Sequence, residues 1–241
     1  MKNNAFSEYR HEYKILKKLR DIDPNGNFHS LLFDAFEFKK EDIPFDFSKC
    51  SLTKPQYTPE EFFVFNILYC GKYNLSYYLK RIFDKNKDTK IIPEPAVLFT
   101  LLTNIFIGIK KMISSNILHK TLDATSIFLR EPISLYNPYA AKIIDYGDGE
   151  LRKYKGFNDK NNDYITLFNS IIEILNEVSK LPHDISYNKM MDELIYGFNE
   201  LKNMVEKNNV SYKQVIKRYI LLLQSVFGKK YSDYALNKYK L

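Results

Sequence analysis

The side chains best suited to chemistry lie in one stretch, NILHKTLDATSIFLREPISLYNPYAAKIIDYG, which runs over residues 116–147. It contains one imidazole, His119, and two aspartates, Asp123 and Asp145. Imidazole and carboxylate groups are the usual proton acceptors of enzymes, and carboxylate oxygens are ligands for Mg²⁺. The hydroxyl of Thr121 is a conceivable nucleophile, but no His or carboxylate pairing in the sequence indicates how it would be activated. Acid–base or metal chemistry is therefore the first possibility to examine.

The elements around this stretch are predicted from apolar periodicity. A wide apolar stripe from 98 to 113 predicts a buried helix before it. Two short apolar runs, 126–129 and 140–144, predict strands joined as a hairpin across the loop 132–138. Helical periodicity returns at Asp163 and continues toward the end of the chain.

The first third of the chain has mixed patterning. A helix is expected over 6–20, with Ser7 as a candidate cap, followed by turn residues at 23–27 and strands within 28–38. Residues 39–59 predict an elaborated loop, whose Phe45, Phe47 and Tyr57 are candidates for docking onto another surface. A buried strand is expected over 61–70, a connector over 71–73 and a short helix over 74–83.

This order of elements and motifs resembles the catalytic core of the eukaryotic-type protein kinases, whose catalytic loop reads H-R-D-L-x-x-x-N and whose metal-binding turn reads D-F-G. His119 stands at the His and Leu122 at the Leu of the loop, while the run Asp145-Tyr146-Gly147 stands at the D-F-G. The resemblance implies an α+β fold: a truncated kinase-like fold with a reduced N-lobe sheet and a mostly helical C-lobe. It places the N-lobe and hinge in residues 1–73 and the helical C-lobe in 74–241.

Flanking residues extend the resemblance over most of residues 6–180. It implies that Tyr69, Cys70 and Gly71 form the hinge, and that the first helix, with Glu12 and Leu16, is the regulatory helix of the N-lobe. Asp163 stands where the family has the opening Asp of the central C-lobe helix, which supports the catalytic loop.

Departures from the family pattern argue against catalysis. In a kinase the loop Asp accepts the substrate proton and the loop Asn holds a second Mg²⁺. Here Thr121 occupies the Asp position and Ser126 the Asn position, while Asp123 lies two positions on. The glycine-rich loop and the ATP-binding Lys would precede Glu12, where no G-x-G-x-x-G occurs, and A-P-E is missing between Gly147 and Asp163.

Several of these residues have a structural interpretation, and for two of them a functional one remains beside it. Asp145 either holds a metal ion or belongs to a retained structural turn. The second interpretation is preferred because no phosphate-binding Lys or loop accompanies Asp145. Tyr146 and Leu16 are interpreted as packing residues and His119 as a satisfied, partly buried histidine. Glu12 is either the regulatory glutamate or a surface residue of a charged helix. Asp163 is expected to cap its helix and to hydrogen-bond the degenerate loop.

Composition limits the partners. The net charge is +7 and the pI about 9.1, which permits an acidic or nucleic-acid partner, although the positive residues are spread along the chain. Two cysteines and four histidines show no disulfide framework or metal-ligand spacing. The longest uncharged apolar stretch, 95–109, is shorter than the roughly 20 residues of a membrane span. The sequence therefore predicts a soluble cytoplasmic protein.

The function that follows is a pseudokinase, a scaffold or allosteric protein-binding module without a cofactor. The resemblance is closest to divergent kinase-like proteins of large DNA viruses, which would place it in an infected cytoplasm or a virus particle. An open strand edge in the reduced sheet predicts a protein partner or a homo-oligomer. Two alternatives remain: a degenerate Mg-ATP-dependent phosphotransferase completed in trans, and a basic nucleic-acid-binding protein.

Overall fold

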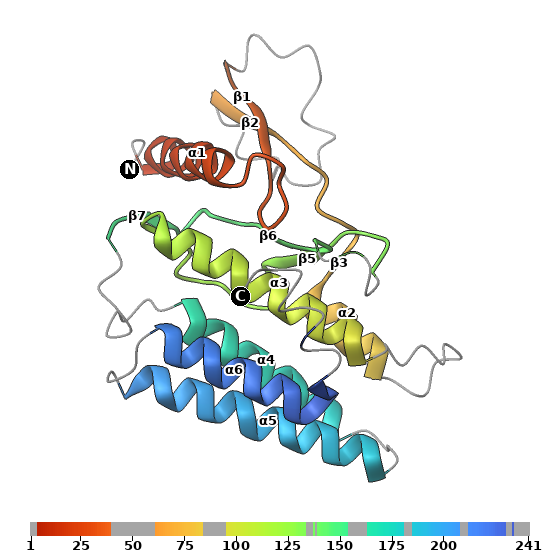
Figure 1. The fold of residues 1–241 in the computed structure, drawn as a ribbon. Helices are drawn as coiled ribbons and strands as arrows, with labels where there is room; N and C mark the ends of the chain where they lie inside the picture. Colours follow the sequence, from red (N-terminus) through yellow and green to blue (C-terminus); the bar gives the residue numbers. More distant parts are fainter. Residues whose placement is uncertain are drawn as a thin grey trace.

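The computed structural model describes residues 4–39, 61–83, 95–133, 137, 139–153, 163–180, 185–207, 212–229 and 233. The chain combines six helices with short antiparallel sheets in this described part, so the α+β class is confirmed. A ribbon of two strands and the first helix lie at one end of the molecule, and a group of three helices lies at the other (Figure 1).

Helix α1 (Asn4–Ile22) confirms the first predicted helix and buries one face, formed by Ile15, Leu16 and Leu19. It begins at Asn4, so Ser7 lies inside the helix and the prediction that it caps the start was wrong. The turn after the helix is organised by the buried Asp23, whose carboxylate accepts the backbone N–H groups of residues 27, 28 and 29.

Strands β1 (Leu32–Lys39) and β2 (Glu61–Ile67) form an antiparallel ribbon beside α1, with Ala35 opposite Phe65 (Figure 1). Arg10 of α1 lies 3.7 Å from Glu37 of β1. Within the described residues each strand of the ribbon pairs only with the other. The predicted loop with Phe45, Phe47 and Tyr57 lies outside the described residues.

A second sheet contains β3 (Tyr73–Asn74), β5 (Ile127–Leu129) and β6 (Ala141–Ile143), in that order and all antiparallel. Strands β5 and β6 form the predicted hairpin, with Phe128 opposite Lys142. Strand β4 (Ile117–Leu118) pairs with β7 (Glu150–Leu151), which brings the two ends of the motif-bearing stretch together.

The remaining helices are α2 (Leu75–Phe83), α3 (Pro95–Ser114), α4 (Asp163–Ser179), α5 (Ile185–Glu206) and α6 (Tyr212–Phe227). Helix α3 is buried continuously from 101 to 109 and lies between the small sheets and the group α4–α6 (Figure 1). Its Phe106 ring lies 4.7 Å from the Tyr164 ring and 4.4 Å from the Tyr219 ring, centroid to centroid. No helix of the described part is both long and apolar enough to cross a membrane.

Candidate functional site

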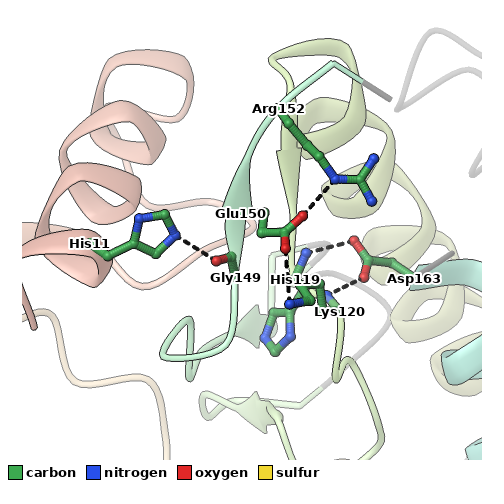
Figure 2. A network of polar contacts seen from close by, with 7 residues as sticks. All are labelled: His11, His119, Lys120, Gly149, Glu150, Arg152 and Asp163. Carbon is green, nitrogen blue, oxygen red and sulfur yellow. Dashed lines mark hydrogen bonds and ion pairs between the residues drawn. The ribbon is translucent and has the colours of Figure 1, made fainter. Parts of the chain in front are cut away.

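The motif-bearing turn is attached to α4 through Asp163. Its carboxylate accepts the backbone N–H of His119 at 2.8 Å and that of Lys120 at 2.7 Å, and the Asp163 side chain is fully buried. Lys120 has a left-handed backbone, with φ at 73°. Asp163 is the first residue of α4, and its two hydrogen bonds to the turn confirm the predicted contact with the loop, while its role as a helix cap stays a prediction (Figure 2).

A cluster of buried rings lies behind the turn. His119 is fully buried, and its Nε2–H donates to the Ile144 carbonyl at 2.8 Å. Its ring centroid lies 5.1 Å from that of Tyr146, which is also fully buried. The predicted packing role of Tyr146 is confirmed, and burial also raises the pKa of its phenol well above the usual value.

Tyr146 also has a polar role that the sequence did not indicate. Its hydroxyl donates to the Ile143 carbonyl at 3.0 Å and lies 3.0 Å from Nδ1 of His29. The phenol has one hydrogen and a carbonyl cannot donate, so His29 Nδ1–H must be the donor to the Tyr146 oxygen. This ring is buried, and burial lowers the pKa of His29 to about 3, with Lys111, His119 and Lys142 acting in the same direction and Asp23 opposing them.

Helix α1 contacts the segment that contains Asp145, Tyr146 and Gly147. Burial and the nearby Asp145 charge raise the pKa of Glu12, while a hydrogen bond from the Tyr146 backbone N–H opposes that rise. One residue earlier, His11 Nε2–H donates to the Gly149 carbonyl at 2.7 Å (Figure 2). Glu12 is therefore partly buried against this segment, and the choice between its two interpretations stays a prediction.

Ion pairs form beside the same segment, on the side opposite to α1 (Figure 2). Glu150 lies 3.0 Å from Nζ of Lys120 and 2.6 Å from Nε of Arg152 (Figure 2). All three side chains remain about a third exposed, so solvent screens the pairs and each adds little to stability. Hydrogen bonds from Arg152 and then Lys120 lower the pKa of Glu150.

The positions that would carry catalysis in the resembled family hold hydroxyl groups. Thr121 is exposed and Ser126 is buried. The Oδ1 atom of Asp123 accepts four hydrogen bonds, from the backbone N–H and the hydroxyl of both Thr125 and Ser126. Burial alone would raise the pKa of Asp123, but these hydrogen bonds lower it. The Asp123 side chain is thus turned into its own loop.

The residues predicted as a hinge follow β2 directly. Tyr69 is 67% exposed, whereas Cys70 is buried, with its thiol donating to the Leu68 carbonyl at 3.1 Å. Gly71 has φ at 128°, and a Cβ placed there would lie 2.0 Å from the Leu129 carbonyl oxygen. Only glycine allows the two backbones to approach so closely.

Asp145 is exposed and has a left-handed backbone, with φ at 65°. The described residues contain no group of three or more His, Cys, Asp or Glu side chains arranged to hold a metal ion. The space around the Gly147 Cα is open, since a Cβ placed there would contact only Asp145 Oδ1, at 3.9 Å. Whether Asp145 binds a metal stays a prediction.

Sequence reasoning missed a buried lysine beside this site. Lys142 of β6 is 3% exposed, and its ammonium donates to the carbonyls of Gly26 and, at 2.8 Å, Asn27. Burial lowers the pKa of Lys142 to about 8, while the charge of Asp23 opposes the shift. A single lysine inside the apolar run 140–144 was the available signal, because a strand buried on both faces must satisfy every charge it contains.

Comparison with known proteins adds no relative: neither a protein family nor a curated protein matches the chain.

Proposed function

We propose that this chain is a catalytically inactive, protein-kinase-like domain that acts as a scaffold or allosteric binding module. The observation that carries the proposal is the contrast within one turn. Asp163 holds the turn at two backbone amides, yet the position that would need a carboxylate carries the exposed hydroxyl of Thr121. A neutral hydroxyl is a poor proton acceptor near neutral pH.

The support for a kinase-like framework is spatial. Tyr146, at the aromatic position of the D-F-G-like run, packs on His119 of the His-x-x-Leu turn. Leu16 of α1 is buried in the same core, and Glu12 accepts a hydrogen bond from the Tyr146 backbone. These residues come from distant parts of the chain, and their contacts support the proposal.

The carboxylate nearest to Thr121 along the chain, that of Asp123, is a poor substitute for the missing base. Asp123 uses Oδ1 to accept four hydrogen bonds within its own turn, and these lower its pKa. A lowered pKa makes a weaker base, so proton abstraction from a substrate hydroxyl is disfavoured further. Ser126 donates to the same oxygen instead of offering an amide oxygen to a second metal ion.

The partner of such a module is a protein or a second copy of the chain. Each strand of the β1–β2 ribbon has one edge without a described strand partner. Phe33 is 52%, Phe36 43% and Ile67 42% exposed on the same ribbon. Strand edges next to exposed apolar side chains favour association with another polypeptide.

The direct test is transfer of radiolabelled phosphate from ATP to the protein itself and to a general acceptor protein, with Mg²⁺ or Mn²⁺. We expect no transfer above the background of a protein-free sample. The variant Asp145→Asn is the control, because transfer that disappears with this single change would contradict the proposal. Light scattering of the same preparation measures whether the chain associates with itself.

A degenerate phosphotransferase completed in trans is the second candidate. It is favoured by the exposed carboxylate of Asp145, which stands next to Glu12 and faces solvent, where a metal ion could reach it. A thermal-shift titration with ATP separates the two candidates, since a ligand that binds the folded state raises the melting temperature by mass action. A rise that needs metal and is lost in Asp145→Asn would favour this second candidate.

A further inference from the structure

Tyrosines and cations gather where β2 leads through the connector into α2. We call Tyr69, Lys72, Tyr73 and Tyr77 the tyrosine patch. Tyr69 is 67% and Tyr77 47% exposed, and Lys72 is exposed as well. None of the interactions of the candidate site described above uses these four side chains.

Three side chains of the patch, those of Lys72, Tyr73 and Tyr77, contact one another. The Tyr73 and Tyr77 rings are nearly parallel, with centroids 5.0 Å apart and 9° between their planes. Lys72 Nζ lies 5.2 Å from the centroid of the Tyr73 ring. The arrangement follows from the start of α2: Asn74 Oδ1 accepts the Tyr77 backbone N–H at 2.8 Å, which places Tyr77 one turn after Tyr73.

The neighbouring backbone is equally constrained. Tyr73 pairs with Leu129 of β5, and Gly71 lies too close to the Leu129 carbonyl for any side chain. The exposed Arg130, which follows β5, lies next to the connector, since a Cβ at Gly71 would be 2.9 Å from the Arg130 backbone nitrogen. Glu131 is near enough to act on the charge of Lys72, so the local charge is mixed rather than strongly positive.

The chemistry of the patch fits a ligand that has flat faces and negative charge. Exposed aromatic rings bind nucleobases by stacking, and this contact tolerates any base sequence. Nearby Lys and Arg side chains suit the phosphate backbone. The whole chain carries a net charge of +7, which attracts a polyanion at long range, so the charge favours a nucleic acid over a protein here.

We propose that the tyrosine patch is a stacking platform for single-stranded nucleic acid, in which bases stack on Tyr69 and Tyr77 while Lys72 and Arg130 contact phosphates. Duplexes are excluded as the main ligand, because their bases are already stacked on each other. This site is independent of the proposed function, since it uses neither the Thr121 turn nor Asp145.

The test is fluorescence anisotropy of a fluorescein-labelled 12-nucleotide oligouridine, titrated with the full chain between about 50 and 200 mM NaCl. We expect saturable binding that an unlabelled duplex of equal length competes for only weakly. Tyr69→Ala and Tyr77→Ala are each expected to weaken binding about tenfold, whereas Tyr69→Phe retains it because the ring remains. Lys72→Ala is expected to lower the slope of log affinity against log salt by about one.

The matched control is Tyr196→Ala. Tyr196 is 66% exposed but lies on α5, in the helical group away from β3 (Figure 1). Circular dichroism confirms that each variant is folded. A second readout is photocrosslinking to 5-iodouridine in the same oligomer, with the crosslinked peptide identified by mass spectrometry; we expect peptides that contain Tyr69 or Tyr77.

Three results would overturn the proposal. The first is an absence of saturable binding at about 100 µM protein in the lowest salt. The second is equal affinity of wild type and the two alanine variants. The third is a crosslink confined to peptides outside the patch.

Discussion

The carboxylate of Asp163 receives two backbone amides from a turn more than forty residues earlier in the chain. The Asp23 carboxylate acts in the same way, because it accepts the backbone N–H groups of residues 27, 28 and 29. Buried backbone N–H groups without such acceptors cost free energy, so each carboxylate fixes a segment that has no regular secondary structure.

At the residue scale, replacing Asp163 tests this anchoring role. Asp163→Ala leaves two buried N–H donors without their acceptor, and we expect the free energy of unfolding to fall by about 3 kcal/mol. Asp163→Asn retains one acceptor oxygen and should lose less. Urea denaturation followed by circular dichroism measures both. The control Asp192→Ala removes an exposed carboxylate from α5 and should change stability by less than about 0.5 kcal/mol; equal losses for Asp163→Ala and Asp192→Ala would contradict the role.

A second residue-scale prediction concerns the loss of folding stability at acidic pH. The pKa of His29 is lowered to about 3 in the folded chain by burial, whereas an unfolded histidine titrates near 6.5. The unfolded state therefore binds an extra proton between these two values, and stability falls as the pH falls through this window. One group contributes up to about 1.4 kcal/mol per pH unit, hence about 2 kcal/mol between pH 6.5 and 5.

Urea denaturation of wild type and His29→Asn at both pH values isolates this contribution, because all other titrating groups are shared. The wild type should lose about 2 kcal/mol more than the variant over the interval. Parallel losses in the two proteins would show that His29 does not stay neutral in the folded state.

At the scale of elements, close backbone approaches set how the small sheets join the rest of the chain. Gly71 lets the connector after β2 reach the end of β5. In the helical group, a Cβ at Gly197 of α5 would lie 2.0 Å from Leu222 Cδ1 of α6. A flexible leucine tip can move away from a new methyl group, whereas the carbonyl of a paired strand cannot do so without breaking the pairing.

The corresponding prediction compares two glycines with positive φ. Gly71→Ala should lower the free energy of unfolding by about 3 kcal/mol or more, since backbone strain is joined by a clash with the Leu129 carbonyl. Gly228→Ala is the matched control, because Gly228 has φ at 86° but nothing within 4 Å, and strain alone should cost about 1 to 2 kcal/mol. Urea denaturation of both variants measures the difference, and equal losses would mean that the clash relaxes at no cost.

At the scale of the whole molecule, one hydrophobic cluster extends from α1 to α6. It includes Leu16, Leu32, Ile143, Phe168 and Leu223, which come from the first helix, the ribbon, the central sheet and the helical group. Side chains that share one core lose their contacts together, so the described parts should unfold in a single cooperative step.

The thiol of Cys70 provides a probe for this prediction. It is buried in the segment between β2 and β3, outside the helices that dominate circular dichroism. In a Cys50→Ser variant, the urea midpoint for reaction of Cys70 with a thiol reagent should coincide with the midpoint of the helical signal. Reaction of Cys70 at clearly lower urea would show that the ribbon end opens separately.

Much of the element order could be predicted, because the signals are local. The apolar stripe predicted α3, the two short apolar runs predicted the β5–β6 hairpin, and Asp163 marked the start of α4. The start of α1 was misplaced because Ser7 has the chemistry of a cap, but the helix extends one turn further back to Asn4. Cap residues indicate a boundary only within a few positions.

The sequence by itself determined that hydroxyl residues stand within the His-x-x-Leu turn, at Thr121, and shortly after it, at Ser126, and which segments are helical or extended. Only the tertiary structure decided that Glu12 contacts the Tyr146 backbone, that His29 donates to the Tyr146 hydroxyl, and that Lys142 is buried against carbonyls of the turn after α1. The physical reason is the sequence separation of the interacting residues. Periodicity reports which face of one element is buried, whereas pairs separated by more than a hundred residues form only when the packing of several elements brings their polar groups together.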